Sequence, residues 1–346
     1  MAEDCQNGGV QSSAARRDLR ALPKAHLHLH LEAAQRPSTL KEFLERYSLP
    51  RPVAGDGTFA TFLRAARVVF TALHSPEDYT RLLREMAEDA TAEGAVWLEP
   101  AVWLTQATAE RIGLPDVEAA LQLILEAARQ ASAQTGLGIG IMVSTSRMRP
   151  SGEAEDLARL AEKYAGRGVV SFGLADDEAN GPADPFADAF AIARAAGLIS
   201  APHAGEHGGP DSVRVALDAL GARRIEHGVR AIEDAELVKR LVQEGVCLDV
   251  CPTSNIQLSV APSLAEHPLP ALVQAGVTVS LNADDPVIFG CGLLDEYELA
   301  RRDFGFDDSV LATIATNSIR ASGAPESIRA GALTRIDAWL SAPDSE

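Results

Sequence analysis

Short apolar runs alternate with longer stretches of helical periodicity along most of the chain. The apolar runs predict eight strands, at residues 25–31, 95–103, 137–144, 169–175, 198–204, 223–227, 246–251 and 277–282. Helical periodicity predicts helices at 79–92, 116–134, 153–164, 186–196, 212–220 and 234–243. Strand and helix in alternation through eight strands indicate parallel pairing and closure into a barrel. The expected fold is therefore α/β, a (β/α)8 barrel of the TIM type.

Three segments fall outside this alternation. Residues 38–73, between the first two strands, are helical in places, and we expect them to form an inserted lid over the barrel mouth. Residues 308–341 predict a helical C-terminal tail on the outside or base of the barrel. Residues 1–20 are polar and lack an apolar segment of signal-peptide length, so we expect a disordered leader before a single domain over 21–342.

Composition narrows the classes of partner. The 346 residues are 46% hydrophobic, enough for a large core, and no apolar run reaches the ~18 residues that span a bilayer. The net charge of −18 disfavours nucleic acid and anionic membranes, both of which require clustered Lys and Arg. Cys5, Cys247, Cys251 and Cys291 lack zinc-ribbon spacing and are interpreted as small fillers in a reducing cytoplasm. The expected partners are a small molecule and water.

Polar side chains gather where the predicted strands end. Seven residues lie at or just past those ends: His28, His30, His203, Glu206, His227, Asp284 and Asp285. Active sites of (β/α)8 barrels lie at the C-terminal ends of the strands, where side chains from distant parts of the chain meet. These residues are therefore expected to share one site.

Two of the histidines have the spacing of metal ligands. His28 and His30 are two residues apart, so on a strand they point to the same face. Alone, the pair is equally compatible with hydrogen-bonded core histidines. With His203 and Asp284 it supplies three nitrogens and one oxygen, which suits Zn²⁺ and leaves a position for water. His26 shares this face one step deeper and is assigned to packing or a hydrogen bond.

The metal is expected to be a single zinc ion per subunit. Barrel hydrolases with two metals hold a carboxylated lysine after the fourth strand, and residues 173–178 contain no lysine. Zinc lowers the pKa of bound water from about 15.7 to about 7, which brings it within reach of an imidazole. His227 is the expected base for that proton, with a fourth metal ligand as the alternative. Asp284 would orient the water while touching the metal.

Two further acids are expected to face the substrate. Glu206 follows His203 by three residues, and a protonated carboxyl there can donate to a ring nitrogen under attack. The alternative for Glu206 is a helix N-cap or a solvated loop acid. Asp285 is expected to bond to substrate while its neighbour binds the metal. Its alternative is an N-cap before Pro286.

At this point the chain resembles the adenosine deaminase family, from Leu22-Pro23-Lys24-Ala25 to the C-terminal helices. Six motifs in order carry the resemblance: His28-Leu29-His30-Leu31-Glu32, Leu174-Ala175 with Asp177-Glu178, His203-Ala204-Gly205-Glu206, Arg224-Ile225-Glu226-His227-Gly228, Cys251-Pro252-Thr253-Ser254-Asn255 and Asn282-Ala283-Asp284-Asp285-Pro286. The resemblance implies hydrolytic removal of the 6-amino group of a purine nucleoside, adenosine to inosine plus ammonia.

The resemblance also implies a role for each site residue. It gives zinc ligation to His28, His30, His203 and Asp284, and catalysis to Glu206, His227 and Asp284. It gives substrate contacts to His30, Glu32, Asp176 and Asp285: Glu206 protonates N1, Asp285 bonds N7, the backbone N–H of Asp176 reaches N3, and Glu32 contacts the ribose. Two positions depart from the family pattern, since Ala33 and Asp176 stand where glycine is usual.

Other readings of the chain differ in substrate or in class. Aminodeoxyfutalosine deamination in menaquinone biosynthesis and adenine deamination keep the same chemistry on another substrate. RNA-editing deaminases use His-x-Glu with Pro-Cys-x-x-Cys ligands, which this chain lacks. A non-catalytic binding protein is opposed by the complete set of ligands and proton-transfer groups. The oligomeric state stays open.

Overall fold

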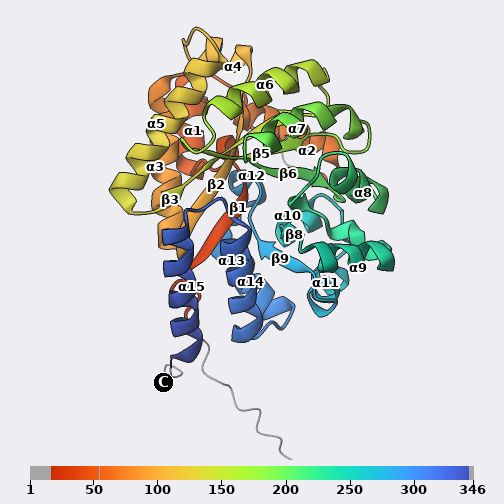
Figure 1. Cartoon of the computed structure of the whole chain (residues 1–346). Helices are drawn as coiled ribbons and strands as arrows, with labels where there is room; N and C mark the ends of the chain where they lie inside the picture. The colour runs from red at the N-terminus through yellow and green to blue at the C-terminus, as the bar shows by residue number, and fades with distance from the viewer. Residues whose placement is uncertain (1–16, 54, 343–346) are drawn as a thin grey trace, which may run out of the picture.

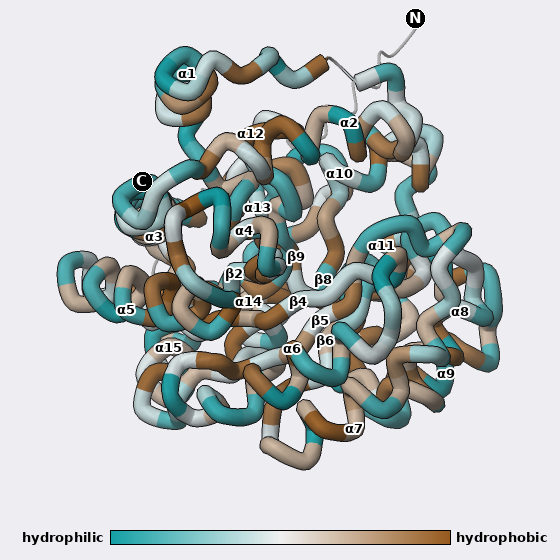
Figure 2. The backbone as a smooth tube through the Cα atoms, turned by 90° about the horizontal axis from the view of Figure 1, so that it is seen from above, coloured by the Kyte–Doolittle hydropathy of each residue, from teal (hydrophilic) through white to brown (hydrophobic). Residues whose placement is uncertain are grey.

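Parallel strands form a barrel in the computed structural model, which describes residues 17–53 and 55–342. The strands are β1 (Lys24–His30), β2 (Ala95–Trp103), β3 (Gly138–Ile139), β4 (Ile141–Ser146), β5 (Val169–Ala175), β6 (Ile199–Ala204), β7 (Arg224–His227), β8 (Cys247–Val250) and β9 (Thr278–Leu281). They pair in the order β1-β2-β4-β5-β6-β7-β8-β9, with β3 on β2. Seen from above, helices surround the strands (Figure 2). The predicted eight-stranded α/β barrel is confirmed.

The third predicted strand, 137–144, is observed as two pieces, β3 and β4. Gly140 separates them, and its backbone N–H donates to the carbonyl of Leu98 at 2.9 Å, so the pairing with β2 continues across the break. A Cβ at Gly138 or Gly140 would lie 2.5 or 2.7 Å from the ring of Trp97. The two glycines are therefore required because the indole lies against the backbone.

The barrel closes where β1 meets the segment after β9. The backbone N–H of His30 donates to the carbonyl of Asp284 at 3.0 Å, and the N–H of Asp284 donates to the carbonyl of His28 at 3.1 Å. Oδ1 of Asn282 accepts from the N–H groups of Leu27 (2.7 Å) and His28 (3.1 Å). This closure places Asp284 beside the two histidines of β1.

The helices cover the outside of the barrel (Figure 1). The main helices after β1 are α3 (Pro76–Ala92), α5 (Val117–Thr135), α6 (Ser151–Lys163), α7 (Ala187–Ala195), α8 (Pro210–Asp218) and α9 (Ala235–Glu244), each at a predicted position. Shorter or later helices that the periodicity did not predict are α4 (Gln106–Arg111), α10 (Pro252–Gln257), α11 (Leu269–Gln274), α12 (Pro286–Phe289) and α13 (Leu293–Asp303). Four of these five have six residues or fewer, too short for a periodic signal.

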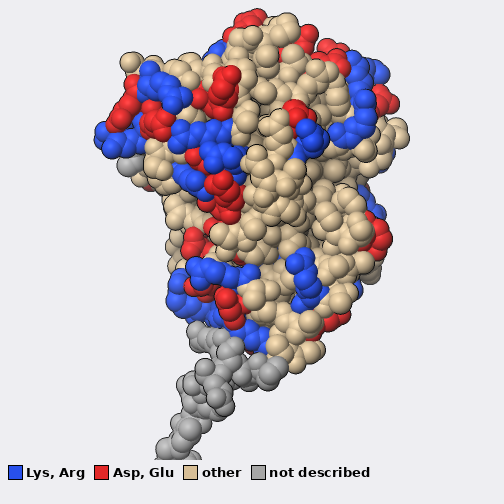
Figure 3. All heavy atoms as spheres, turned by 90° about the vertical axis from the view of Figure 1, so that its left-hand side faces the viewer, with Lys and Arg blue, Asp and Glu red and all other residues tan. Residues whose placement is uncertain are grey.

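The region expected to form a lid contains two helices with different roles. Residues of α2 (Phe59–Phe70) line a cavity at the barrel mouth, as expected of a lid. In contrast, α1 (Pro37–Arg46) packs beside α3, where Thr39 donates to Glu85 at 2.6 Å and Arg81 pairs with Glu42 at 2.8 Å. On this side of the molecule acidic and basic side chains intermingle (Figure 3). The lid prediction is therefore corrected to α2 alone.

The C-terminal tail lies at the base of the barrel, at the lower end in Figure 1. It consists of α14 (Asp308–Ala321) and α15 (Glu326–Ser341). Oγ of Ser318 accepts from the backbone N–H of Ala25 at 2.9 Å, so α14 covers the N-terminal end of β1. The predicted tail is confirmed.

The N-terminal boundary requires a correction. Residues 1–16 of the expected leader lie outside the described residues, but 17–20 are packed against the tail. Leu19 is buried, Arg17 pairs with Asp308 at 3.1 Å, and Trp339 donates to the carbonyl of Asp18 at 2.9 Å. The buried leucine and these polar contacts hold residues 17–20 in place, so they do not belong to a disordered leader.

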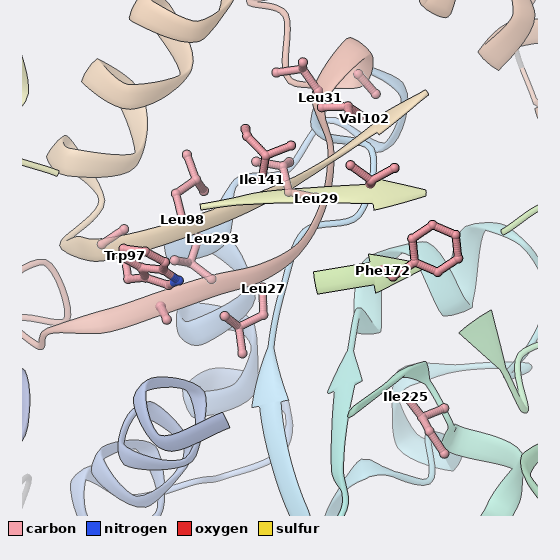
Figure 4. Packing of buried hydrophobic residues seen from close by; sticks show 14 of the residues in the cluster. Leu27, Leu29, Leu31, Trp97, Leu98, Val102, Ile141, Phe172, Ile225 and Leu293 are labelled. Atoms are coloured by element: carbon pink, nitrogen blue, oxygen red, sulfur yellow. The ribbon is translucent and has the colours of Figure 1, made fainter. Parts of the chain in front are cut away.

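Alternate positions of β1 serve the core and the site. Leu27 and Leu29 belong to the apolar cluster that also contains Leu98 and Val102 of β2 (Figure 4). The histidines occupy the intervening positions and face the barrel interior, as the two-residue period of a strand requires. Among the described residues, no helix combines the length and apolar character needed to cross a membrane.

Candidate active site

Five side chains from four strand ends meet at the barrel mouth. His28 and His30 come from β1, His203 from β6, His227 ends β7, and Asp284 follows β9. Their rings are close together: the centroid of His28 lies 4.8 Å from that of His203 and 4.6 Å from that of His227. The structure thus brings together residues that are up to 256 positions apart in the sequence.

The backbone is strained at this site. His227 and Asp284 have positive φ angles of 66° and 61°, and Asp176 has 84°. Residues other than glycine adopt this region only where the surrounding structure holds them there, and such strain clusters at functional sites. These turns direct the chain away from the strand just after it has delivered a polar side chain to the mouth.

Nε2 of His28 and a carboxylate oxygen of Asp284 face each other within the site. Nδ1 of His28 lies 3.2 Å from the carbonyl oxygen of Asp249, which can only accept, so the ring proton sits on Nδ1. Nε2 therefore carries a lone pair; it is buried, has no hydrogen-bond partner, and lies 3.2 Å from Oδ1 of Asp284. Burial opposes a charge on His28, but the charges of Cys251, Glu226 and Asp284 outweigh it and raise the pKa of His28 well above its ordinary value. A proton on Nε2 or a metal ion can therefore join the two groups.

The spacing of these atoms suits a small ion. Nε2 of His30 lies 3.3 Å from the same Oδ1 of Asp284. Ligands bound tetrahedrally at the usual 2.0–2.1 Å of zinc lie about 3.3 Å apart. Burial disfavours the Asp284 carboxylate, but His28 and the hydrogen-bonding imidazoles around it hold its pKa well below the usual range. Asp284 is therefore an ionised carboxylate, the form that binds a metal.

His203 is oriented by a second carboxylate. Its Nδ1 lies 2.6 Å from Oε2 of Glu226, which directs the Nε2 lone pair toward the other imidazoles. A histidine whose far nitrogen donates to a carboxylate is the usual arrangement at zinc sites. Burial also lowers the pKa of His203, which favours the neutral form that a metal requires.

The ligand atoms form two overlapping groups that can each hold a metal ion. One consists of His28, His203, His227 and Asp284, and the other of His30, Asp284 and Asp285. The four predicted ligands, His28, His30, His203 and Asp284, all lie within these groups. The chemistry of the set, imidazoles around a carboxylate, fits Zn²⁺.

His227 and Glu206 lie together on the substrate side. Nε2 of His227 is 3.5 Å from Oε1 of Glu206 and 3.8 Å from Oδ2 of Asp284. Burial, reinforced by the charge of Asp284, raises the pKa of Glu206 well above its ordinary value. The shift favours the protonated form, which can act as a donor, and the burial of the side chain excludes a solvated loop acid.

Sequence reasoning missed how the Glu206 loop is held. The carboxylate of Glu178 accepts from the backbone N–H groups of residues 205–208, at 2.6 to 3.0 Å, and from the hydroxyl of Ser212. Although burial opposes ionisation, these donors lower the pKa of Glu178. An acid in the motif Asp177-Glu178 was visible, but only the fold shows that it binds a turn 28 residues later.

Asp285 faces the site as an unpaired acid. Both of its carboxylate oxygens are buried without a hydrogen-bond partner. Asp285 is the N-cap residue of α12, as the alternative expected, but its side chain makes no capping hydrogen bond, so the carboxyl group is left to face the site. Burial raises the pKa of Asp285 to about 8, an effect that His30 opposes and Asp284 reinforces.

The departure at Asp176 is accommodated. Its Oδ2 accepts from the hydroxyl of Ser146 at 2.6 Å, and Oδ1 accepts from the N–H of Asp177 at 2.9 Å. These bonds anchor the side chain while the backbone keeps the positive φ that glycine would otherwise supply. Asp176 still lines the cavity beside the proposed reaction centre.

The cavity at the mouth has a volume of about 360 Å³. Its outer wall carries Phe59, Phe62 and Phe70 of α2 with Trp103 of β2. Glu32 also lines it: Oε1 accepts from the N–H of Trp103 at 3.4 Å, whereas Oε2 is buried with no partner. Burial raises the pKa of Glu32 to about 7. The arrangement suits a flat, mostly apolar ring with a few polar edges.

His26 has a structural role. Its Nε2 accepts from the N–H of Ala283 at 3.1 Å, at the closure of the barrel. Burial lowers its pKa to about 3, so the ring is neutral. The expected hydrogen-bonding role, outside the ligand set, is confirmed.

A buried charge network beneath the site was not predicted. Arg224 pairs with Glu99 at 2.7 Å and with Asp249 at 2.8 Å, and all three side chains are fully buried. Because the carbonyl of Asp249 holds His28, the network supports the proposed ligands from below. Its signal in the sequence was a charged residue in each of the strands β2, β7 and β8.

Comparison with known proteins agrees with this geometry. The family model described as Adenosine deaminase matches residues 23–339. A putative adenosine/adenine deaminase from Streptomyces virginiae is 44% identical, covering 94% of this chain and 98% of that protein. An adenine deaminase from Chelativorans sp. (strain BNC1) is 39% identical over 91% and 98% of the two chains. An aminodeoxyfutalosine deaminase from Streptomyces avermitilis is 34% identical over 99% of each.

Solved structures show the same fold. The adenine deaminase from Arthrobacter aurescens superposes with a TM-score of 0.84 at 30% identity, over 93% of this chain and all of that chain. An amidohydrolase from Burkholderia ambifaria with bound Zn superposes with a TM-score of 0.83 at 26% identity, over 93% and 92% of the two chains. The chain is a hydrolytic purine deaminase and belongs to the adenosine deaminase family.

Proposed function

We propose that the protein removes the 6-amino group of an adenine nucleoside hydrolytically, with adenosine giving inosine and ammonia, and that it uses one zinc ion per subunit. The facing lone pairs of His28 and Asp284 carry the metal part of this proposal. In the proposed assignment His28, His30, His203 and Asp284 hold the ion. When bound, zinc lowers the pKa of a water molecule to about 7 and so supplies the nucleophile.

The other residues of the site act either on the attacking water or on the purine ring. Asp284 orients the water and His227 lies beside it. On the ring side, Glu206 gives its proton to N1, which makes C6 electrophilic. This role requires a protonated carboxyl group, and the raised pKa of Glu206 favours that form.

Two further acids bind the substrate in this proposal. Asp285 keeps a proton at neutral pH, with a pKa raised to about 8, so it can donate to the lone pair of N7. The backbone N–H of Asp176 faces N3. Glu32, with its unpaired Oε2, contacts the ribose. His30 touches both the ion and the substrate.

Free adenine is the second candidate substrate. Two observations favour it: relatives at 36–39% identity are named adenine deaminases, and the outer wall of the cavity is largely aromatic. Aminodeoxyfutalosine is a third candidate, favoured by the named relative at 34% identity. We place the reaction in the cytoplasm, where the unpaired thiols of Cys247, Cys251 and Cys291 would remain reduced.

The test is the ultraviolet absorbance change from amine to oxo purine on zinc-loaded protein, with the three substrates at equal concentrations. Highest kcat/KM with adenosine supports the proposal, and highest kcat/KM with either other compound assigns that substrate instead. No turnover of any of the three overturns the proposal. Zinc-stripped protein is the control for metal dependence, and restored activity on adding zinc excludes damage by the chelator.

A further inference from the structure

A chain of hydrogen bonds runs from a backbone amide to the ring of His227. The N–H of Leu269 donates to Nδ1 of His267 at 3.1 Å. Nε2 of His267 lies 3.1 Å from Oδ1 of Asn255, and Nδ2 of Asn255 lies 3.2 Å from Nδ1 of His227. The three side chains are buried, so water does not compete for these bonds.

The backbone amide sets the direction of every bond in this chain. Because the N–H of Leu269 can only donate, Nδ1 of His267 is an acceptor and the ring proton is on Nε2. That proton goes to Oδ1 of Asn255, which leaves the Asn255 NH₂ to donate to Nδ1 of His227. An acceptor Nδ1 means that neutral His227 carries its proton on Nε2.

We propose that Asn255 and His267 are positioning residues that hold the proton of His227 on Nε2, so that His227 faces the reaction centre as a hydrogen-bond donor. From the sequence, His227 was expected to act as a base or, alternatively, as a fourth metal ligand. The donor role replaces both. The part of the inference that concerns catalysis rests on the proposed function; the position of the proton does not.

The neighbouring histidines show the opposite polarity. Nδ1 of His28 donates to a carbonyl and Nδ1 of His203 faces a carboxylate, so each presents a bare Nε2 to the centre. His227 presents an N–H. The group behind each ring thus determines its role: His28 and His203 can bind a metal through Nε2, whereas His227 donates a hydrogen bond from Nε2.

Reversing the direction of these hydrogen bonds would place two donors against each other. If Asn255 turned its oxygen to His227, its NH₂ would face Nε2 of His267, and that ring would need its proton on Nδ1. Two N–H groups, those of His267 and Leu269, would then point at each other. Burial also lowers the pKa of His267 to about 4, so a doubly protonated ring does not relieve this.

The donor on Nε2 has two acceptors in reach. Oε1 of Glu206 lies 3.5 Å away and Oδ2 of Asp284 lies 3.8 Å away. Once Glu206 has given its proton to the ring, its carboxylate can take the proton of the water: the water O–H bond breaks and a carboxyl O–H bond forms. His227 then stabilises the oxygen by donation and stays neutral.

The direct test is nuclear magnetic resonance of protein labelled with ¹⁵N-histidine, with and without zinc. Long-range ¹H–¹⁵N correlations distinguish the two tautomers of each ring, and the His227→Gln variant identifies the signals of His227. A proton on Nε2 of His227 in the unaltered protein is the expected result. A proton on Nδ1 overturns the proposal.

Variants of Asn255 and His267 test the series of hydrogen bonds. Asn255→Asp offers only acceptors to both rings, so it should move the His227 proton to Nδ1 and lower kcat by about 100-fold while zinc content is kept. Asn317→Asp, which adds the same charge on α14 at the base, is the control. His267→Gln retains a donor for Asn255 and should keep the tautomer, whereas His267→Leu should give a mixture. An unchanged tautomer in both Asn255→Asp and His267→Leu contradicts the proposal.

The outcomes separate this inference from the proposed function. A proton on Nε2 in a protein that deaminates none of the three purines leaves the hydrogen-bond chain intact and removes the function. Purine deamination by a protein with the His227 proton on Nδ1 supports the proposed function and overturns the hydrogen-bond chain. If Asn255→Asp does not fold, the tautomer of the unaltered protein and of His267→Leu still decides the question.

Discussion

Oε2 of Glu226 lies 2.6 Å from Nδ1 of His203, with both side chains buried. The two residues are register partners on adjacent parallel strands, β6 and β7. Burial opposes a charge on Glu226, but His203 and the neighbouring imidazoles lower its pKa to about 2, so the carboxylate is ionised. A group of this kind keeps the ring of His203 in one orientation and one tautomer, with Nε2 free for a metal.

Replacing Glu226 should therefore weaken metal binding without abolishing it. We expect Glu226→Gln to lower zinc affinity by about 10- to 100-fold, the usual cost of losing the carboxylate behind a metal-binding histidine. Competition with a chromogenic chelator measures this. His203→Ala should lose the metal altogether, and the exposed Glu233→Gln should change nothing. Full zinc affinity in Glu226→Gln would show that Glu226 does not support metal binding, and full zinc content in His203→Ala would show that His203 is not a ligand.

Glu206→Gln should separate metal binding from catalysis. The amide keeps the shape of the side chain but cannot give a proton to N1, so kcat should fall by about 100- to 10,000-fold. Zinc content by elemental analysis should stay at one per chain, because Glu206 is outside the proposed ligand set. Turnover within a few-fold of the unaltered protein would remove Glu206 from the mechanism.

Arg224→Met should destabilise the fold. The substitution leaves Glu99 and Asp249 as buried carboxylates without their partner, and breaking such a pair from one side costs about 3–5 kcal/mol. The free energy of unfolding from urea titrations measures the loss. Arg240→Met, at a partly exposed ion pair with Asp218, is the control and should cost less than about 1 kcal/mol. Equal losses in the two variants would refute the structural role of the network.

Glu296→Gln should change how stability depends on pH. Burial raises the pKa of Glu296 to about 7 from an ordinary 4.5, so the folded protein holds this proton after the unfolded chain has released it. Its contribution to stability is complete below pH 4.5 and is lost as the pH rises to 7. The amide cannot ionise and avoids that loss.

Relative to the unaltered protein, Glu296→Gln should therefore gain about 3 kcal/mol between pH 4.5 and 8. Urea titrations at several pH values within this range measure the difference, and it should level off above pH 7. Glu298→Gln, on the same helix, is the control. A difference that stays constant with pH would show that Glu296 ionises normally in the fold.

The strand pattern was predictable because local periodicity and burial agree in a parallel barrel. Runs such as 95–103 and 169–175 have both faces covered, so they are mostly apolar, with Glu99 and Ser171 as the buried exceptions. The same rule located His203, His227 and Asp284, since the C-terminal ends of the strands open on one mouth. Residues 137–144 are interrupted at Gly140, where a Cβ would meet the ring of Trp97.

By itself, the sequence determined the barrel, the family and the residues gathered at its mouth, since periodicity and ordered motifs are local properties of the chain. Only the tertiary structure decided what each of these residues does. The tautomer of a histidine depends on the group behind its ring. For His28, His203 and His227 that group is Asp249, Glu226 and Asn255, each on another strand or helix. Likewise, the pKa of Glu206 depends on burial and on Asp284, 78 residues away. Electrostatics and hydrogen bonding act through space, and spacing along the chain does not encode them.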